Sequence, residues 1–202
     1  MSEPVQNADI VAEMKRRKIS QLLHFTPMEN LVQMMNYGCI LPREALEKED
    51  FTANDAVRLD GSDHINLSVQ QCNSRLFYVF RRRAGALSAS AGQQQPSWAM
   101  ISIRPEALTL GKCCFTATNA ASHAAVRLTG TDGFRKLFAG SDDMIPADSQ
   151  AECLFFAPIP LDYWQAVYVK DHEMQAQVYC LMSVMGVPRS AFEVVVNPGF
   201  FR

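Results

Sequence analysis

Short apolar runs separated by polar turns recur along the chain, a pattern typical of β-strands in a globular protein. Strands are predicted over residues 22–25, 65–69, 76–80, 98–103, 113–116, 153–159, 166–169 and 192–196. Apolar positions at helical spacing predict helices over residues 7–18, 27–37, 133–138 and 172–185, and Gly38 ends the second of them. This mixture, without an internal repeat, predicts one α+β domain over residues 1–202 with a strand-rich core.

Long polar stretches interrupt these elements. Residues 42–63 are charged and lack a sustained apolar period, so they predict a long loop with a helical piece. Residues 88–96, rich in Ser, Ala, Gly and Gln, predict a flexible insertion. Residues 119–148 combine polar loops with the helix predicted at 133–138. The predicted domain therefore carries long loops on one side of its core.

Composition narrows the class of protein only slightly. The chain has 202 residues and a hydrophobic content of 48%, which suits a single core. Its 19 basic and 21 acidic residues give a net charge of −2, so the global charge does not indicate a nucleic-acid-binding protein. Any site for nucleic acid must therefore be local.

The cysteines favour a reducing compartment. None of the six forms a CxxC pair, and Cys114, Cys153 and Cys180 lie in apolar contexts that suit buried thiols. The first 17 residues are charged rather than signal-like, and no apolar run reaches the ~18 residues of a membrane span. We therefore expect a soluble cytoplasmic protein without a membrane partner.

One carboxylate stands at the head of an apolar run. Glu152 precedes Cys153-Leu154-Phe155-Phe156-Ala157, which is typical of a buried strand. Burying a lone carboxylate costs several kcal/mol or raises its pKa, so such an acid usually has a partner or a reaction to serve. The alternative from the pattern alone is that Glu152 lies at the solvent edge of the strand.

A second cluster of polar residues follows the first strand. Leu22-Leu23-His24-Phe25-Thr26, with Asn30 four residues later, places an imidazole and a hydroxyl beside the start of a helix, where free N–H groups can meet phosphate or carboxamide oxygens. That arrangement suits a nucleotide. The alternative is that His24 only makes structural hydrogen bonds.

With these residues in place, the chain resembles the DarT toxins, which are DNA ADP-ribosyltransferases that use NAD. The resemblance spans about residues 20–170 and depends on four pieces in the right order, namely His24-Phe25-Thr26 with Asn30 and Gly38, Arg58 in the long loop, the strand and turn over residues 65–77, and Gln150-Ala151-Glu152 opening a strand that ends in Pro160. It implies an ADP-ribosyltransferase-like fold, with two packed sheets, helices and long active-site loops.

The resemblance also implies roles for single residues. His24 and Thr26 would hold the nicotinamide amide and the ribose, and Arg58 would face the NAD phosphates and the reacting centre. Glu152 would be the catalytic acid, which holds a ribose hydroxyl and stabilises the oxocarbenium-like centre as nicotinamide leaves. The remaining residues assigned to NAD binding are Phe25, Asn30, Ser68 and Arg75.

The chain departs from the family in residues 68–77. The family often has an Asn-Pro-Arg-Asn-Pro-Met-Leu-Tyr-like turn there, of which this chain keeps chiefly Asn73 and Leu76, without the prolines. The target base, thymine or guanine, is therefore left open. Residues 116–148 take the place of the family's substrate-reading loop, and the alternative for them is a surface connection.

The function implied is that of a toxin. It would transfer ADP-ribose from NAD, as co-substrate and without a metal, to a base in single-stranded DNA. A cognate antitoxin with ADP-ribose hydrolase activity would restrain it. The alternatives are an RNA or protein target, or a catalytically inactive member of the fold that binds NAD or nucleic acid. The inactive alternative is disfavoured because a binding module would not need Glu152 together with His24 and Arg58.

Two further motifs carry weaker signals. Arg81-Arg82-Arg83 could bind phosphates of a single strand, although such a run is more often a solvated strand end. His64 and His172-Glu173 lack further metal-binding residues at the usual spacing, so no metal site is predicted.

Overall fold

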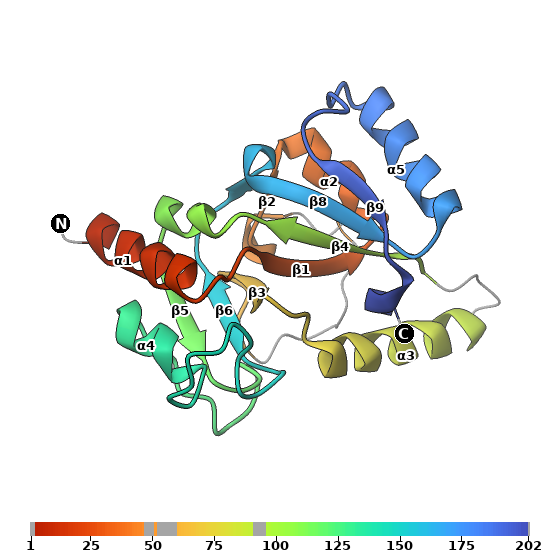
Figure 1. Cartoon of the computed structure of the whole chain (residues 1–202). Helices are drawn as coiled ribbons and strands as arrows, with labels where there is room; N and C mark the ends of the chain where they lie inside the picture. The colour runs from red at the N-terminus through yellow and green to blue at the C-terminus, as the bar shows by residue number, and fades with distance from the viewer. Residues whose placement is uncertain (1–2, 47–50, 52–59, 91–95, 202) are drawn as a thin grey trace.

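The computed structural model describes residues 3–46, 51, 60–90 and 96–201, and its centre is a seven-stranded sheet (Figure 1). The strand order is β5-β6-β3-β1-β4-β8-β9, with every pair antiparallel except β8 and β9. The strands are β1 (Leu22–Pro27), β3 (Ile65–Val69), β4 (Trp98–Ile103), β5 (Cys113–Thr116), β6 (Glu152–Phe155), β8 (Trp164–Val169) and β9 (Glu193–Val196). A second, two-stranded sheet joins β2 (Cys39–Ile40) to β7 (Ile159–Pro160).

The helices surround this sheet (Figure 1). They are α1 (Glu3–Arg16), α2 (Asn30–Tyr37), α3 (Ser74–Ser90), α4 (Gly130–Lys136) and α5 (His172–Val184), with 3-10 turns η1 (Arg43–Ala45), η3 (Pro105–Leu110), η4 (Leu161–Tyr163) and η5 (Pro198–Phe201). Helices α1 and α4 lie together at the β5 end of the sheet, whereas α5 lies beside β8 and β9. The predicted α+β fold is confirmed.

Strand β4 is buried along its whole length. All six of its residues are buried, because it lies between β1 and β8 and has both faces covered. Ala99 and Ile101 belong to a large apolar core, while Trp98 and Met100 point the other way into a smaller one. The smaller core also holds Phe77 of α3, so it fixes that helix against the sheet.

The strand predicted over residues 76–80 is wrong, because these residues belong to α3. The Asn73 side-chain oxygen accepts the Leu76 N–H at 3.0 Å, which satisfies a donor in the first turn of the helix. A short apolar run does not separate a strand from a buried helix, and the missing signal was this cap. The insertion predicted at residues 88–96 is wrong in its first part, because α3 continues to Ser90, and residues 91–95 lie outside the described chain.

Other boundaries shift by a few residues. The apolar run predicted as one strand over 153–159 forms β6 up to Phe155 and then β7 in the other sheet. The predicted stop at Gly38 is confirmed, since this residue has a φ of 68° and ends α2. Of the three cysteines expected to be buried, Cys114 and Cys153 are buried but Cys180 is exposed on α5.

Candidate functional site

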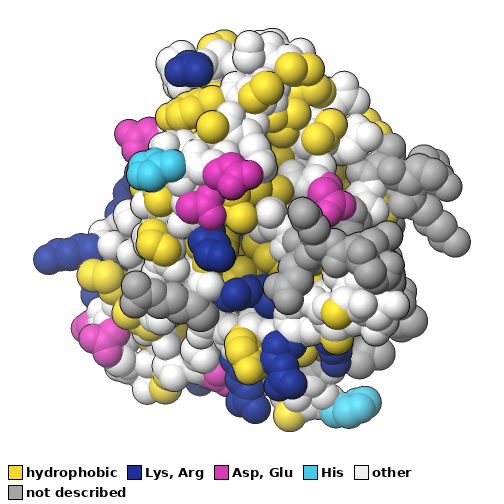
Figure 2. All heavy atoms as spheres, turned by 90° about the vertical axis from the view of Figure 1, so that its right-hand side faces the viewer, with side chains coloured by type: hydrophobic (Ala, Val, Ile, Leu, Met, Phe, Trp, Pro, Cys, Tyr) yellow, Lys and Arg dark blue, Asp and Glu magenta, His cyan; other side chains and the backbone are white. Residues whose placement is uncertain are grey.

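A cavity of roughly 370 Å³ opens where β1, α2, α3 and the β3–β6 pair meet. Figure 2 shows a face of the molecule that is hollowed at its centre, with hydrophobic side chains inside and charged side chains around them. The polar and aromatic residues that line the cavity include His24, Phe25, Thr26, Asn30, Tyr37, Arg43, Asp60, His64, Asn66, Ser68, Phe80, Arg83, Asn119 and Glu152. The volume is in the range of small-molecule sites.

Glu152 is the buried carboxylate of this cavity. As the first residue of β6 it pairs with Ser68 of β3 on one side and Thr116 of β5 on the other. Its side chain is only 3% exposed, and its Oε2 accepts the backbone N–H of Ala120 at 2.8 Å. The solvent-edge alternative is therefore wrong: the acid is inside the sheet and lines the cavity.

His24, Thr26 and Asn30 converge on the same cavity. The His24 Nδ1 lies 3.1 Å from the backbone oxygen of Asn66, which orients the imidazole. Asn30, at the start of α2, donates from Nδ2 to the Thr26 hydroxyl at 2.9 Å. The end of β1 and the first turn of α2 therefore hold their polar side chains in a fixed relation.

An aromatic wall supports the polar groups. The Phe25 ring lies 5.2 Å from Phe77, 5.8 Å from Phe80 and 6.3 Å from Trp98, measured between centroids. Such tilted pairs pack tightly and favour a rigid surface. Because Phe25 and Phe80 also line the cavity, one side of it is an apolar platform.

The remaining predicted site residues differ in position. Ser68 is 5% exposed, lines the cavity, and accepts the Asn73 backbone N–H at 3.0 Å. Arg75 is exposed in the first turn of α3 and is not among the residues that line the cavity. Arg58 lies outside the described residues. The roles given to these residues stay predictions.

A polar cluster that sequence reasoning missed lies at the cavity edge. His64 is fully buried, with Nδ1 2.8 Å from Asp63 Oδ1 and Nε2 3.4 Å from Asp60 Oδ2. Asn66 donates to the same Asp60 oxygen at 2.8 Å. The hydrogen bond from His64 lowers the pKa of Asp63 below its ordinary value. The available signal was the closeness of Asp60, Asp63 and His64 in the sequence.

The loop after β5 also borders the cavity. Asn119 and Ala121 line it, and Ala120 between them donates to Glu152. This contact ties the segment predicted to read the substrate directly to the predicted catalytic acid.

The described residues hold neither a metal-binding cluster nor a membrane-spanning helix. They contain no group of three or more His, Cys, Asp or Glu placed to hold a metal ion. Within the same part of the chain, no helix is both long and apolar enough to cross a membrane.

The donor set fits a nucleotide such as NAD. Amide, imidazole and hydroxyl groups face one cavity with a buried carboxylate and an aromatic platform. Arg43 and Arg83 bring cationic groups to the same cavity, where phosphate oxygens are suitable partners. The arrangement can therefore bind an apolar ring, a ribose and phosphates side by side.

Solved structures share this fold. The Thermus sp. 2.9 DarT in complex with NAD+ matches with a TM-score of 0.67 and 14% identity, over 91% of this chain and 98% of that one. The same protein in complex with ADP-ribosylated ssDNA gives a TM-score of 0.66 at 14% identity, over 91% and 96% of the two chains. Thermosipho africanus DarTG in complex with ADP-ribose gives 0.57 at 18% identity, over 90% of this chain and 51% of that one.

A comparison with the curated proteins found no match. A family model described as "ssDNA thymidine ADP-ribosyltransferase, DarT" matches residues 23–202. That range contains Glu152, the residues that line the cavity and every strand of the described chain except the first residue of β1, and the segment with α1 lies before it. The resemblance noted from the sequence is thereby confirmed, and the chain belongs to the DarT family of single-stranded DNA ADP-ribosyltransferases.

Proposed function

We propose that this chain transfers ADP-ribose from NAD to a base in single-stranded DNA. The observation that carries the proposal is Glu152, a buried carboxylate on β6, between β3 and β5, which accepts the Ala120 N–H and lines the cavity. Family membership supports the same reaction.

The predicted residues have separate tasks in this proposal, and Arg75, which is exposed and does not line the cavity, has none in NAD binding. His24 and Thr26 hold the nicotinamide amide and the ribose, while Phe25, Asn30 and Ser68 complete the pocket. Arg58 acts on the NAD phosphates and at the reacting centre. Glu152 holds a ribose hydroxyl and stabilises the positive charge that develops as nicotinamide leaves. The bond from ribose to nicotinamide breaks, a bond from ribose to the base forms, and the base loses one proton.

The biological setting is part of the same proposal. We infer that the enzyme is a cytoplasmic toxin restrained by a cognate antitoxin with ADP-ribose hydrolase activity. Its support is the family membership and the likeness to Thermosipho africanus DarTG in complex with ADP-ribose. Growth arrest on expression, relieved by an ADP-ribose hydrolase encoded next to the gene, is the expected result. An absence of both effects would contradict the toxin role.

The acceptor base needs its own experiment. The family description names thymidine, whereas the turn at residues 68–77 lacks the prolines that the family often has. Oligonucleotides that contain thymine or guanine as the only modifiable base separate the two. Mass spectrometry of the labelled strand then identifies the modified nucleotide.

The reaction itself is tested with labelled NAD. The purified chain is incubated separately with ssDNA, dsDNA, RNA and cell protein, and transfer and nicotinamide release are measured. We expect ssDNA to be labelled most strongly, because extruding a base from a duplex costs a few kcal/mol. Preferred labelling of RNA or protein would replace the proposed acceptor, and NAD binding without transfer to any of them would indicate an inactive member.

A further inference from the structure

Three consecutive arginines of α3 point in three different directions. The Arg81 guanidinium donates to the backbone oxygen of Phe201 and lies 5.5 Å from the Phe77 ring centroid, so it supports the smaller core. Arg83 lines the cavity. Arg82 is exposed and lies 5.8 Å from the Tyr78 ring centroid. Because helix residues turn by about 100°, one charge run serves three surfaces.

The exposed side of α3 carries a stripe of basic and aromatic residues. Arg75, Tyr78 and Arg82 follow each other at i, i+3 and i+7, so they lie on one helix face. All three are exposed, and Tyr78 is 53% exposed. We call this set the α3 stripe. Its length along the helix axis is about 10 Å, from a rise of about 1.5 Å per residue.

The charge of α3 is unlike that of the chain as a whole. The helix contains four arginines and no Asp or Glu, although the chain has a net charge of −2. Basic side chains also gather at the lower edge of the hollowed face in Figure 2. The local charge therefore favours an anionic partner that the global charge does not indicate.

The stripe also adjoins the cavity. Leu76, Val79 and Arg83 of the same helix line it, so the stripe and the cavity occupy neighbouring faces of α3. A strand that places one base in the cavity must continue across an adjacent surface. On this surface the guanidinium groups match phosphates, and the exposed Tyr78 ring offers a stacking platform for a base.

We propose that the α3 stripe binds the nucleotides next to the target base, with Arg75 and Arg82 on phosphates and Tyr78 stacked on a base. This inference rests on the proposed function, because it assumes that single-stranded DNA is the acceptor. The proposal gives neighbouring arginines different roles: Arg82 binds the DNA, and Arg81 stabilises the smaller core.

Binding is tested with a fluorescent ssDNA of about 16 nucleotides at several salt concentrations. Tyr78→Ala should weaken binding about 5- to 100-fold, because one base loses its stacking partner, while Tyr78→Phe should bind like the wild type. Arg82→Gln should lower the slope of log K against log salt by about 0.7, the value for one phosphate contact on a single strand.

A matched control is available elsewhere in the chain. Arg189 is also exposed and lies 4.6 Å from the Tyr179 ring centroid, between α5 and β9 rather than on α3 (Figure 1). Arg189→Gln removes the same charge from the same kind of pair and should leave the affinity and the slope unchanged. Equal losses of ssDNA affinity in Arg82→Gln and Arg189→Gln would overturn the proposal. Wild-type affinity in Tyr78→Ala would also overturn it. Stronger stripe-dependent binding of RNA of the same sequence would overturn DNA as its partner.

Kinetics distinguish this inference from the proposed function. With an ssDNA of about 16 nucleotides as the acceptor, Arg82→Gln and Tyr78→Ala should raise the KM for DNA and leave kcat and the KM for NAD unchanged. With the shortest strand that is still modified, the variants should match the wild type. If the wild type modifies no DNA at all, the proposed function fails, while the binding experiment still reports on the stripe. If the wild type modifies both strands and the variants do so equally well, the stripe proposal alone fails.

Discussion

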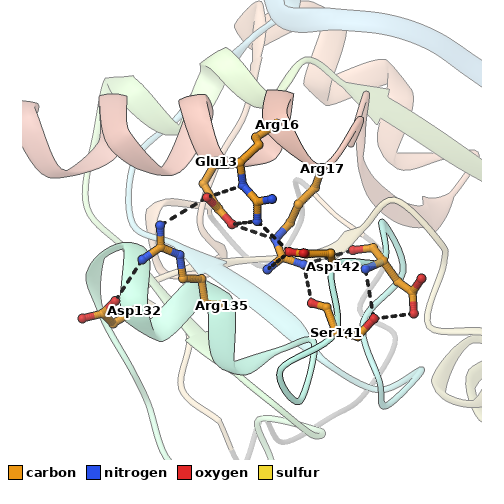
Figure 3. A network of polar contacts seen from close by, with 8 residues as sticks. Glu13, Arg16, Arg17, Asp132, Arg135, Ser141 and Asp142 are labelled. Carbon is orange, nitrogen blue, oxygen red and sulfur yellow. Dashed lines mark hydrogen bonds and ion pairs between the residues drawn. The ribbon is translucent and has the colours of Figure 1, made fainter.

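Among the glutamates whose burial the structure describes, Glu13 and Glu152 are buried, and their surroundings differ. Glu13 of α1 is 5% exposed and Glu152 of β6 is 3% exposed. Glu13 is surrounded by arginines and is not among the residues that line the cavity (Figure 3). Glu152 accepts a backbone N–H and lines the cavity. Burial alone therefore does not mark a catalytic carboxylate.

The arginines around Glu13 join separate parts of the chain. Its carboxylate lies 2.7 Å from Arg16, 2.9 Å from Arg17 and 3.3 Å from Arg135 of α4. Arg17 also donates to the backbone oxygens of Ser141 and Asp143. These contacts fix α1 against the segment that leads to Glu152 (Figure 3).

The different surroundings of Glu13 and Glu152 indicate different roles for their negative charges. Hydrogen bonding to Arg16, followed by that to Arg135 and Arg17, outweighs burial and lowers the pKa of Glu13 to about 2. Such a carboxylate stays ionised and contributes to folding. Glu152 has a side chain at a cavity, where a developing positive charge on a substrate can meet it. Exchanging each acid for its amide separates a charge that stabilises the fold from the charge that we propose to act in catalysis.

The largest effect is expected for Glu152→Gln. The amide keeps the shape of the side chain but loses the negative charge, so transfer should fall about 10²–10³-fold, as for loss of one well-placed electrostatic group. NAD affinity should change little, because the charge acts mainly on the transition state. Transfer to ssDNA, NAD calorimetry and melting temperature are measured on one preparation. A stable, NAD-binding variant with the wild-type rate would exclude Glu152 from catalysis.

The opposite pattern is expected for Glu13→Gln. Loss of the charge weakens the bonds to three arginines and leaves Arg17, which is 4% exposed, without its main counter-charge. The free energy of unfolding should fall by about 2–3 kcal/mol, which lowers the melting temperature by roughly 5–10 °C. At a temperature where the variant is folded, its specific rate should equal that of the wild type. A loss of specific rate as large as that of Glu152→Gln would contradict a purely structural role for Glu13.

The sequence revealed these two acids unequally. Glu152 was predictable because it stands at the head of an apolar run and in the order of residues that resembles the DarT family, although the run alone also fitted a position at the solvent edge. Glu13 did not stand out, since a charge in an amphipathic helix usually faces solvent. Its partner Arg135 is 122 residues away, and only the tertiary fold brings them together.

Tertiary packing also explains why the strand predicted over residues 76–80 is wrong. Most strands were predictable, because strands such as β4, β5 and β6 are buried along their whole length and therefore appear in the sequence as short apolar runs. Residues 76–80 were not, because the apolar side chains of α3 pack against the smaller core in a short run that also fits a strand. The cluster around His64 was missed because the contact between Asp60 and the His64 ring depends on the conformation of the loop that joins them.

Acid titration gives a third, smaller test of the comparison. Because the pKa of Glu13 is lowered from 4.5 to about 2, its contribution to stability is complete above pH 4.5 and is lost as the pH falls toward 2. The difference in melting temperature between the wild type and Glu13→Gln should therefore be constant above pH 4.5 and shrink below it. Melting curves between pH 7 and the lowest pH at which both proteins refold measure this difference. A difference that is unchanged down to pH 3 would mean that the charge of Glu13 is not what stabilises the fold.

The smallest expected effect distinguishes two of the arginines around Glu13, Arg135 and Arg17. Arg135 is 53% exposed, and its other partner, Asp132, is 94% exposed. Such a pair is screened by water and salt, so Arg135→Gln should cost less than about 1 kcal/mol, and less still at high salt. Arg17→Gln should cost more, because this side chain is 4% exposed and also lies 4.2 Å from the Phe138 ring centroid. Urea unfolding of both variants at low and high salt measures the order. Equal costs would show that burial does not decide the strength of the Glu13 contacts, and a loss of transfer in Arg135→Gln without a loss of stability would extend the catalytic site to α4.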